Sequence, residues 1–302
     1  MQGNPIPRWV GVSILLCISV VFGSNHIAAR FAFEHGSNVA TAVAFRATFA
    51  LVFVFVLLAA NRVSFSLPGV TRARGMAIGG FLLLQSYCVF SAVARIPVAL
   101  ALLAFNTYPI IIALTAWLVD GERPTLRAMI AIPLAFGGLA LALDVGGWSG
   151  AGASSFAGRW DEIGIGVLFA TGASLTFSAA LYLTTRWMKD VDGRLRTFLA
   201  TGTISVCALS IGTMTNAFAL PADTTGWIAL CLVGLCYSTA VTALFVVLPR
   251  IGVAGNAAVL NFEPVAVLVM GWILLGQTMA PLQIFGALVV VGAIIALSTG
   301  KK

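Results

Sequence analysis

Charged side chains are scarce in this sequence. Asp, Glu, Lys and Arg make up only 9% of the 302 residues, whereas a soluble domain carries about 25%. Together with a mean hydropathy of +1.03, this scarcity excludes an ordinary soluble domain and predicts an integral membrane protein. A spanning helix needs about 20 mostly apolar residues, so the chain has room for about ten spans.

Cysteine pairs and catalytic motifs are missing as well. The five cysteines lie inside apolar segments without paired loop spacing, so we expect free, packed thiols and neither a disulfide nor a metal site. There is no His, Asp and Glu cluster with metal-ligand spacing, no Ser nucleophile motif and no Gly-rich phosphate loop. We therefore expect no catalytic residues, no cofactor and no enzyme activity.

The apolar segments predict an all-α integral membrane protein with ten transmembrane helices. A stretch rich in Gly, Ser and Ala at 144–162 divides them into two sets of five and predicts a connecting loop. The predicted units are a first repeat at 1–143, this loop, and a second repeat at 163–302. The predicted spans are residues 9–32, 38–60, 75–94, 98–119, 126–143, 163–186, 196–216, 226–248, 254–275 and 281–298.

The positive charges predict the orientation. With the N-terminus placed in the cytoplasm, 13 of the 17 Lys and Arg fall on the cytoplasmic side, and only Arg30, Arg46, Arg95 and Arg159 do not. Because cytoplasmic loops carry an excess of Lys and Arg, we expect a multi-pass protein of the bacterial inner membrane with both termini in the cytoplasm. The net charge of +7 serves this orientation, and we expect no nucleic-acid partner.

One apolar stretch occurs twice. Asn106 to Gly121, NTYPIIIALTAWLVDG, recurs as Asn261 to Gly276, NFEPVAVLVMGWILLG, and both 261 − 106 and 276 − 121 give an offset of 155. Because each unit has an odd number of spans, the second unit enters the membrane from the opposite side. Such inverted repeats are a recurring construction of secondary transporters. We expect the two copies to be antiparallel partners that cross near the membrane centre.

Several short motifs follow one another through both halves. They are Phe22 to Asn25, Phe45 and Arg46, Pro109 with Trp117, Gly121 to Arg123, Glu263 with Pro264, and Gly276. In this order the chain resembles the drug/metabolite transporter superfamily, specifically its EamA-type ten-helix exporters, and is most similar to the bacterial aromatic amino acid exporters. It departs from them at Gln277, where the family usually has Glu.

This resemblance implies export by alternating access through a cavity lined by the third, fourth, eighth and ninth spans. It brings forward four substrate-binding candidates, Gln85, Asn106, Tyr237 and Asn261. Polarity inside the spans adds Asn25, Tyr87 and Tyr182, because an unpaired polar group in hydrocarbon is costly.

Two prolines lie inside predicted spans. Pro109 and Pro264 each remove a backbone hydrogen bond, which predicts a hinge in either span. Asn106 and Asn261, one turn earlier, either bind substrate or bond the carbonyls of a neighbouring helix.

Three ionisable residues inside the spans allow two interpretations each. Glu263 is either a proton-coupling carboxylate or a structural carboxyl beside Pro264. Arg46 either attracts the carboxylate of a substrate or, without such a role, snorkels outward or pairs with Glu34. His26 either titrates near neutral pH and shares in coupling or is simply hydrogen-bonded.

The sequence therefore predicts a secondary transporter that exports amino acids, aromatic and other neutral ones, or related small metabolites. The alternatives are the same scaffold exporting another metabolite or a drug-like cation, and an integral-membrane enzyme. The expected partners are the small-molecule substrate and the lipid bilayer. The small residues Gly75 and Gly79 predict close helix packing inside a monomer, with a weak homodimer as the alternative.

Overall fold

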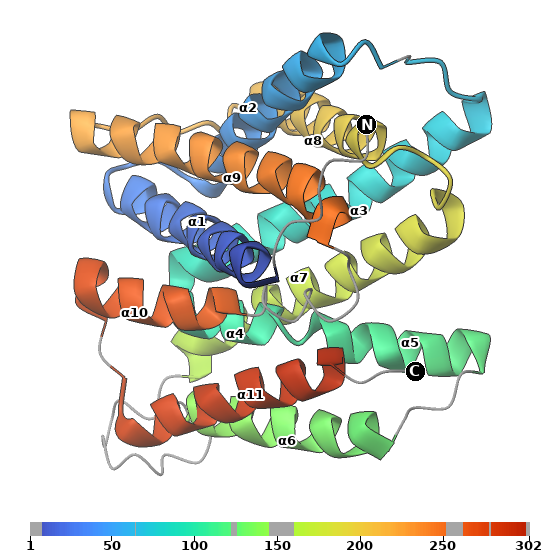
Figure 1. Cartoon of the computed structure of the whole chain (residues 1–302). Coiled ribbons are helices and arrows are strands. Elements are labelled where there is room, and N and C mark those ends of the chain that lie inside the picture. Colours follow the sequence, from blue (N-terminus) through green and yellow to red (C-terminus); the bar gives the residue numbers. More distant parts are fainter. Residues whose placement is uncertain are drawn as a thin grey trace.

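The computed structural model describes residues 8–63, 65–121, 126–144, 160–251, 262–277 and 279–299. Every regular element in these residues is an α-helix (Figure 1). Most of the predicted connecting loop, residues 145–159, lies outside them. The helices are α1 (Arg8–Glu34), α2 (Val39–Ala60), α3 (Gly69–Arg95), α4 (Val98–Phe105), α5 (Tyr108–Asp120), α6 (Leu126–Ala142), α7 (Trp160–Trp187), α8 (Gly193–Met214), α9 (Thr224–Ile251), α10 (Glu263–Leu275) and α11 (Pro281–Thr299).

The helices follow the predicted spans closely where the chain is described. Seven helical segments in these residues are long and apolar enough to cross a membrane, one of them being α4 and α5 taken together. Three apolar helices are shorter, Met129–Ala142, Glu263–Leu275 and Pro281–Ala296. An all-helical membrane protein is therefore confirmed, and the number of ten spans stays a prediction.

The fourth predicted span is broken in the middle. Asn106 ends α4, and its side-chain amide donates to the Leu102 carbonyl at 2.8 Å. Thr107 Oγ1 donates to the Ala104 carbonyl at 2.7 Å, so two carbonyls near the break are bonded by side chains. Pro109 then lies in the first turn of α5, where its missing N–H costs nothing. The break lies where the sequence predicted a hinge.

Helices α5 and α10 preserve the repeat in their geometry. Both have 13 residues, both carry Pro in the first turn, and 263 − 108 and 275 − 120 again give 155. Each ends at a glycine in the left-handed region, Gly121 at φ 70° and Gly276 at φ 61°, a conformation that glycine adopts without steric cost. The shared bounds and caps support a two-repeat architecture.

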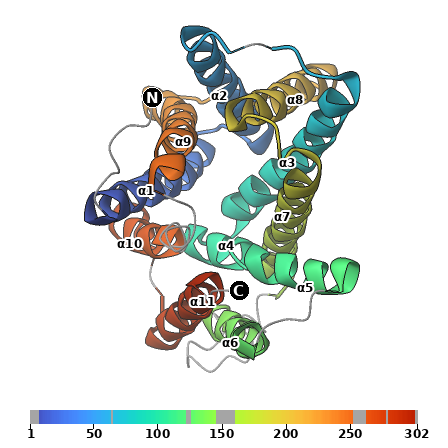
Figure 2. The same ribbon diagram turned by 45° about the vertical axis from the view of Figure 1, so that its right-hand side comes forward.

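Helix packing follows a pseudo-twofold exchange of the two repeats (Figure 2). The exchange turns α1 into α7, α2 into α8, α3 into α9, α5 into α10 and α6 into α11. Accordingly α1 packs on α9 as α7 packs on α3, and α1 packs on α10 as α7 packs on α5. The pairs α2 with α8 and α6 with α11 map onto themselves, which places them on the pseudo-axis.

One expectation about the repeated stretch is wrong. We expected its two copies to cross as partners, but the main neighbours of α10 are α1 and α4, and the main neighbour of α5 is α7. In both views α5 and α10 lie on either side of α4 (Figures 1 and 2). The break between α4 and α5 explains the difference, because the residues that reach the centre belong to α4.

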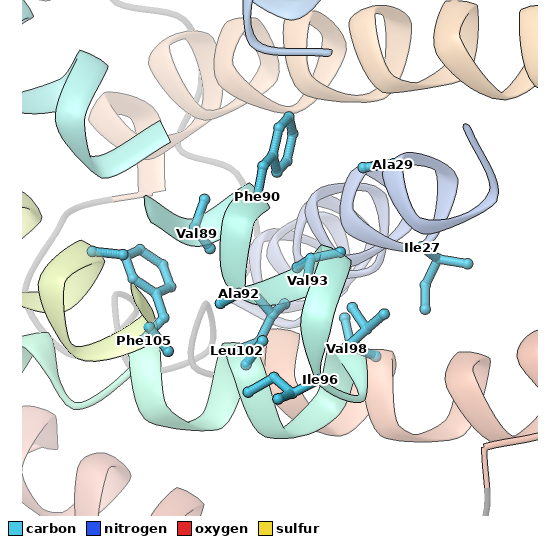
Figure 3. Packing of buried hydrophobic residues seen from close by; sticks show 14 of the residues in the cluster. Ile27, Ala29, Val89, Phe90, Ala92, Val93, Ile96, Val98, Leu102 and Phe105 are labelled. Atoms are coloured by element: carbon cyan, nitrogen blue, oxygen red, sulfur yellow. The ribbon is translucent and has the colours of Figure 1, made fainter. Parts of the chain in front are cut away.

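The largest apolar cluster surrounds the turn from α3 into α4 (Figure 3). Phe90, Ile96 and Leu102 are completely or almost completely buried there. All eight residues of α4 are buried, so this short helix is the centre of the bundle. Gly75 and Gly79 let α8 approach closely, since a Cβ at either position would lie 2.6 Å from Leu199 or Thr203. This small-residue face is thus used inside the chain.

Candidate functional site

A cavity of about 440 Å³ lies between the two sets of helices. Its lining comes from α1, α2, α3, α5, α7, α8, α9 and α10, with Phe105 and Asn106 from the break after α4. Along α3 it extends from Gly75 to Ser86, which is about 17 Å of helix. Its volume falls in the range of about 300–1,000 Å³ that is usual for small-molecule pockets.

Arg46 on α2 is a buried cation facing this cavity. The residue is 4% exposed, and Nη2 donates to Ser86 Oγ at 2.5 Å. Its guanidinium carbon lies 4.6 Å from the ring centre of Phe90 and 4.4 Å from that of Tyr237. Among the described residues no carboxylate forms an ion pair with it, and Glu34 pairs with Arg30 instead, at 2.7 Å. The expectation that Arg46 snorkels outward or pairs with Glu34 is therefore wrong.

His26 and Glu263 connect the two repeats at the cavity. His26 Nε2 on α1 lies 3.5 Å from Glu263 Oε1 in the first turn of α10. His26 is 5% exposed, and its Nδ1 has no hydrogen-bond partner among the described residues. Glu263 is the only acidic residue in the first turn of α10, where the helix dipole stabilises a negative charge.

Four predicted substrate-binding residues also line the cavity: Asn25, Gln85, Asn106 and Tyr237. Asn25 stands out because it is 0% exposed and neither amide atom has a hydrogen-bond partner in the described part of the chain. Leaving a buried polar group unbonded costs about 1–3 kcal/mol. The Asn25 amide is thus a buried polar group at the cavity whose hydrogen-bonding capacity is unused in the described residues.

The other candidates lie elsewhere. Tyr182 donates to Asp120 at the ends of α5 and α7, with distances of 3.0 and 2.9 Å to the two carboxylate oxygens, and Arg186 pairs with the same carboxylate. Tyr87 packs against the main apolar cluster rather than lining the cavity. Pro264 lines a small apolar pocket beside α11, and Pro109 lines no described pocket. Asn261 lies outside the described residues.

A single family model matches both sets of helices. The model of the EamA-like transporter family matches residues 9–143 and 164–299. The chain belongs to the EamA-like transporter family. Membership makes it a membrane transporter of small metabolites, and it confirms that part of the sequence-based prediction.

One solved structure supports the fold of this EamA-like chain. A crystal structure described only as that of a protein has a TM-score of 0.61 and 16% identity, and the similarity covers 95% of each chain. At this identity the likeness shows the fold alone. No curated protein matches the chain.

The cavity of this EamA-like transporter is lined by equivalent positions of the two repeats. We call two residues counterparts when their numbers differ by 155, the offset of the repeat. Seven pairs of counterparts face the cavity on both sides. They are Phe22 and Phe177, Asn25 and Ala180, His26 and Leu181, Arg46 and Thr201, Leu82 and Tyr237, Ser86 and Val241, and Tyr108 and Glu263.

The two ends of the cavity are not equivalent. One end, the Arg196 end, is lined by Gly75, Thr184, Met188, Arg196 and Thr197. Their counterparts Leu230, Ala29, Phe33, Thr41 and Ala42 do not line the cavity. We call the region of these counterparts the Thr41 end.

Hydrogen bonds close the Thr41 end. Thr41 Oγ1 donates to the Ala219 carbonyl at 2.9 Å, and the Ala219 N–H lies 3.1 Å from the same oxygen. Asn38 Nδ2 donates to the Ala217 carbonyl at 2.6 Å. Beside them His35 Nδ1 lies 2.7 Å from Asp223 Oδ2. The loop between α1 and α2 is thereby bound to the loop between α8 and α9.

The chemistry of Asp223 suits this role. The Gly226 N–H donates to its carboxylate at 2.8 Å, and together with the His35 ring it holds the pKa of Asp223 below its usual range. Because the pKa is lowered, the Asp223 side chain is the charged carboxylate when it accepts these hydrogen bonds. The stability that the bonds contribute is lost only when the pH falls below the usual pKa range of aspartate.

Leu181, Thr201 and Arg196 are among the cavity residues that sequence reasoning missed. Neither Leu181 nor Thr201 belongs to a motif, but each is the counterpart of a charged candidate, His26 or Arg46. Applying the 155 offset to every candidate would have found both. Sequence reasoning used Arg196 only in the count of positive charges. Its position next to a loop gave no sign that it lines the cavity.

Proposed function

We propose that the cavity binds a zwitterionic small metabolite, an amino acid or a close relative, and that the protein exports it by alternating access. The observation that carries this proposal is the buried Arg46 guanidinium, which faces the cavity without a carboxylate partner in the described residues. An unpaired cation at the middle of a membrane helix costs about 2.5–3.5 kcal/mol. The carboxylate of a ligand offsets this cost and fits the guanidinium fork.

We propose that the ammonium group of the same ligand binds beside the His26–Glu263 pair. Glu263 places a carboxyl group at the cavity, and its side chain is 16% exposed. Asn25, which precedes His26 in α1, adds an amide without a hydrogen-bond partner in the described residues. We assign His26 and Glu263 a charge role in binding, with proton coupling as the alternative that the experiment below separates.

The proposed transport cycle uses the two repeats as rocking units. We place them at 1–143 and 163–302, joined by the loop at 144–162 and inverted in the membrane, with Pro109 and Pro264 as hinges. The excess of Lys and Arg on one side supports a cytoplasmic location of both termini and of the Arg196 end. This orientation fits the inner membrane of a bacterium. We propose a monomer as the transporting unit, with a weak homodimer as the alternative.

The test is uptake into liposomes that contain the purified protein. A panel of labelled aromatic and other neutral amino acids is assayed with and without an imposed pH gradient. Competition by phenylalaninamide, which lacks the carboxylate, and N-acetylphenylalanine, which lacks the ammonium group, then reports each charge requirement. We expect both analogues to compete more weakly than phenylalanine by about tenfold or more, since hydrogen bonds to charged groups contribute about 1.5–3 kcal/mol.

Variants assign these requirements to residues. Arg46→Gln is expected to remove most of the preference for phenylalanine over its amide, whereas Arg95→Gln, at the exposed end of α3, leaves it unchanged. Glu263→Gln is expected to remove the preference over N-acetylphenylalanine. If Glu263→Gln instead preserved that preference and abolished only the response to a pH gradient, proton coupling would be its role.

A second candidate function is export of a cation without a carboxylate, and the acidic Glu263 at the cavity favours it. Under this function phenylalaninamide or a quaternary amine competes better than phenylalanine, and Arg46→Gln increases uptake. Equal competition by every compound of the panel, or no uptake by wild type, would contradict the amino acid proposal.

A further inference from the structure

A second arginine without an ion-pair partner lines the cavity, at the Arg196 end. Arg196 lies in the first turn of α8, and its Nε is buried without a hydrogen-bond partner in the described residues. The nearest acidic residue along the chain, Asp192, is paired with Arg194 instead, with Nη2 and Oδ2 3.0 Å apart. No ion pair between described residues includes Arg196. This end of the cavity therefore carries an unpaired positive charge.

The hydroxyl groups near Arg196 accept hydrogen bonds from the cavity rather than donate to it. Thr184 on α7 and Thr197 and Thr201 on α8 line the cavity, and each hydroxyl donates to a backbone carbonyl of its own helix, at 2.6, 3.0 and 2.8 Å. A hydroxyl has one O–H donor and two lone pairs, so these three offer only acceptors to a ligand. Arg196 thus suits an anionic group, and the threonine oxygens beside it suit an ammonium group.

Arg46 lies at the opposite end of the same cavity. Its Nη2 bonds Ser86, the cavity residue of α3 that lies farthest along the helix from Gly75. At the other end of this stretch, a Cβ on Gly75 would lie 2.6 Å from Leu199, which follows Arg196 by three residues. The cavity-lining stretch of α3 therefore separates the two arginines.

The contact between α2 and α8 gives the same separation. The two helices are antiparallel, because the start of α2 is bonded to the loop after α8 while the hydroxyls of Thr48 and Ser205, further into both helices, lie 2.8 Å apart. From this contact Arg46 is two residues away in one direction and Arg196 is nine residues away in the other, which together is about 17 Å of helix. An amino acid is too short to bond both arginines at once, so they are separate sites.

We infer that Arg196 is an outer carboxylate site, at which an amino acid binds first and from which it passes to Arg46. This inference rests on the proposed function, which places the bound carboxylate at Arg46 and the Arg196 end on the cytoplasmic side. In the described residues only the positions of the Arg196 end line the cavity, so a substrate enters there. On this path the carboxylate pairs with Arg196 while the threonine oxygens accept hydrogen bonds from the ammonium group.

An outer site of this kind acts on the rates of binding rather than on the final affinity. A cleft lined by charge of one sign raises the association rate of an oppositely charged ligand by about 10–1,000-fold. Because the carboxylate has left Arg196 when it reaches Arg46, Arg196 stabilises the passage and not the final complex. Removing Arg196 therefore slows entry and exit equally, whereas removing Arg46 raises the dissociation constant.

The experiment measures the exchange of 4-fluorophenylalanine with the purified protein in detergent, from fluorine NMR line shapes at low ionic strength. Arg196→Gln is expected to lower the association and dissociation rate constants by about tenfold each, with an unchanged Kd. Higher ionic strength should slow association with wild type and have a weaker effect on Arg196→Gln, since salt screens the attraction between Arg196 and the carboxylate.

Two controls separate a carboxylate site from a general effect of charge. 4-Fluorophenylalaninamide lacks the carboxylate, so its association with Arg196→Gln should not be slower than with wild type. Arg72→Gln removes the same charge from the exposed first turn of α3, three residues before Gly75, at a position that does not line the cavity. This variant should keep the wild-type rates for both compounds.

A second variant guards against misfolding of the first. Arg196→Lys keeps the charge but loses the planar fork that binds a carboxylate through two hydrogen bonds. Association of 4-fluorophenylalanine should be slower than with wild type and faster than with Arg196→Gln. Size-exclusion profiles identify a variant that does not fold, and the other variant then carries the test.

The outcomes separate this inference from the proposed function. Absence of 4-fluorophenylalanine binding by wild type, or an unchanged Kd in Arg46→Gln, contradicts the proposed function itself. If wild type binds the compound and Arg46→Gln raises the Kd, but the folded Arg196 variants keep the wild-type rates, there is no outer site. Equal slowing by Arg72→Gln, equal slowing of the amide, or a raised Kd in Arg196→Gln would also overturn the inference.

Discussion

The Thr41 end and the Arg196 end are built from the same positions of two similar repeats, yet in the described residues only the positions of the Arg196 end line the cavity. At the Thr41 end, Thr41 bonds both backbone groups of Ala219. At the other end its counterpart Arg196 lines the cavity, and its Nε has no hydrogen-bond partner in the described residues. Alternating access requires that the two repeats place equivalent positions in different environments. When the repeats exchange their conformations, the opening moves from one end of the cavity to the other.

The helix packing shows the same difference. Near the Thr41 end α1 packs against α3, and Arg30 Nη1 donates to the carbonyls of Val93 and Ala94 at 3.0 and 3.2 Å. The exchanged pair, α7 and α9, has no comparable packing among the described residues. The comparison therefore assigns closure to the ends of α1 and α3 together with two loops, and it makes this closure testable.

The largest effect is expected from preventing the Thr41 end from opening. Thr41→Cys combined with Ala219→Cys places two thiols across the hydrogen-bonded contact, where a short bifunctional thiol reagent can join them. We expect uptake to fall by tenfold or more after cross-linking, since export requires this end to open. Labelled amino acid uptake is measured before the reagent is added, after it, and after cleavage of the link.

Each single cysteine variant is the control for this experiment, because the chain already contains Cys17, Cys88, Cys207, Cys231 and Cys236. Both should keep their uptake in the presence of the reagent. Complete cross-linking without loss of uptake would show that the Thr41 end stays closed during transport.

A smaller effect is expected from weakening the closed end. Thr41→Val preserves the shape of the side chain and removes its bonds to Ala219. At about 0.5–1.5 kcal/mol for each of the two lost bonds, the equilibrium constant for the closed arrangement should fall by roughly five- to 150-fold. Hydrogen exchange of residues 215–223 measures the loss as faster exchange.

Thr203→Val serves as the matched control for this variant. Its hydroxyl bonds the Leu199 carbonyl of its own helix, so the exchange of residues 215–223 should stay at the wild-type rate. Equal acceleration by both variants would mean that lost threonine hydroxyls, rather than an opened end, cause the change.

The smallest effect is expected at Gln277, where this chain departs from the family pattern. Gln277 Oε1 accepts a hydrogen bond from the Val98 N–H at 3.2 Å, at the start of α4. Gln277→Glu keeps the acceptor and adds negative charge at a helix N-terminus, a change that stabilises by about 0.3–1 kcal/mol. We expect slower amide exchange of residues 98–101 in this variant and faster exchange in Gln277→Ala. The reverse order would contradict the capping role.

Much of the fold follows from local patterns. Hydropathy located the helices because each membrane helix satisfies its own backbone and needs only apolar side chains. Pro109 likewise located the break that follows Asn106, and the repeated stretch ends at Gly121 and Gly276, which cap α5 and α10, since proline and glycine act on the backbone around them. These features depend on neighbours within a few residues.

The candidate site was only partly predictable. The cavity is lined by seven of the residues that polarity and the family resemblance singled out, namely Asn25, His26, Arg46, Gln85, Asn106, Tyr237 and Glu263. Tyr182, which bonds Asp120, and Tyr87, which packs against the main apolar cluster, do not line it. A hydroxyl on a membrane helix needs a hydrogen-bond partner, but the rotation of the helix about its axis determines which residue that partner is. That rotation is set by packing against neighbouring helices.

The sequence by itself determined a helical membrane protein with a repeated unit, because composition and a constant offset are properties of the chain. Only the tertiary structure decided that Arg46 lacks a carboxylate partner among the described residues and that His26 meets Glu263. It also decided that hydrogen bonds join two loops at the Thr41 end and that Leu181 and Thr201, the counterparts of His26 and Arg46, line the same cavity. The physical reason is that these properties arise between helices far apart in sequence, whose contacts depend on how interleaved repeats pack.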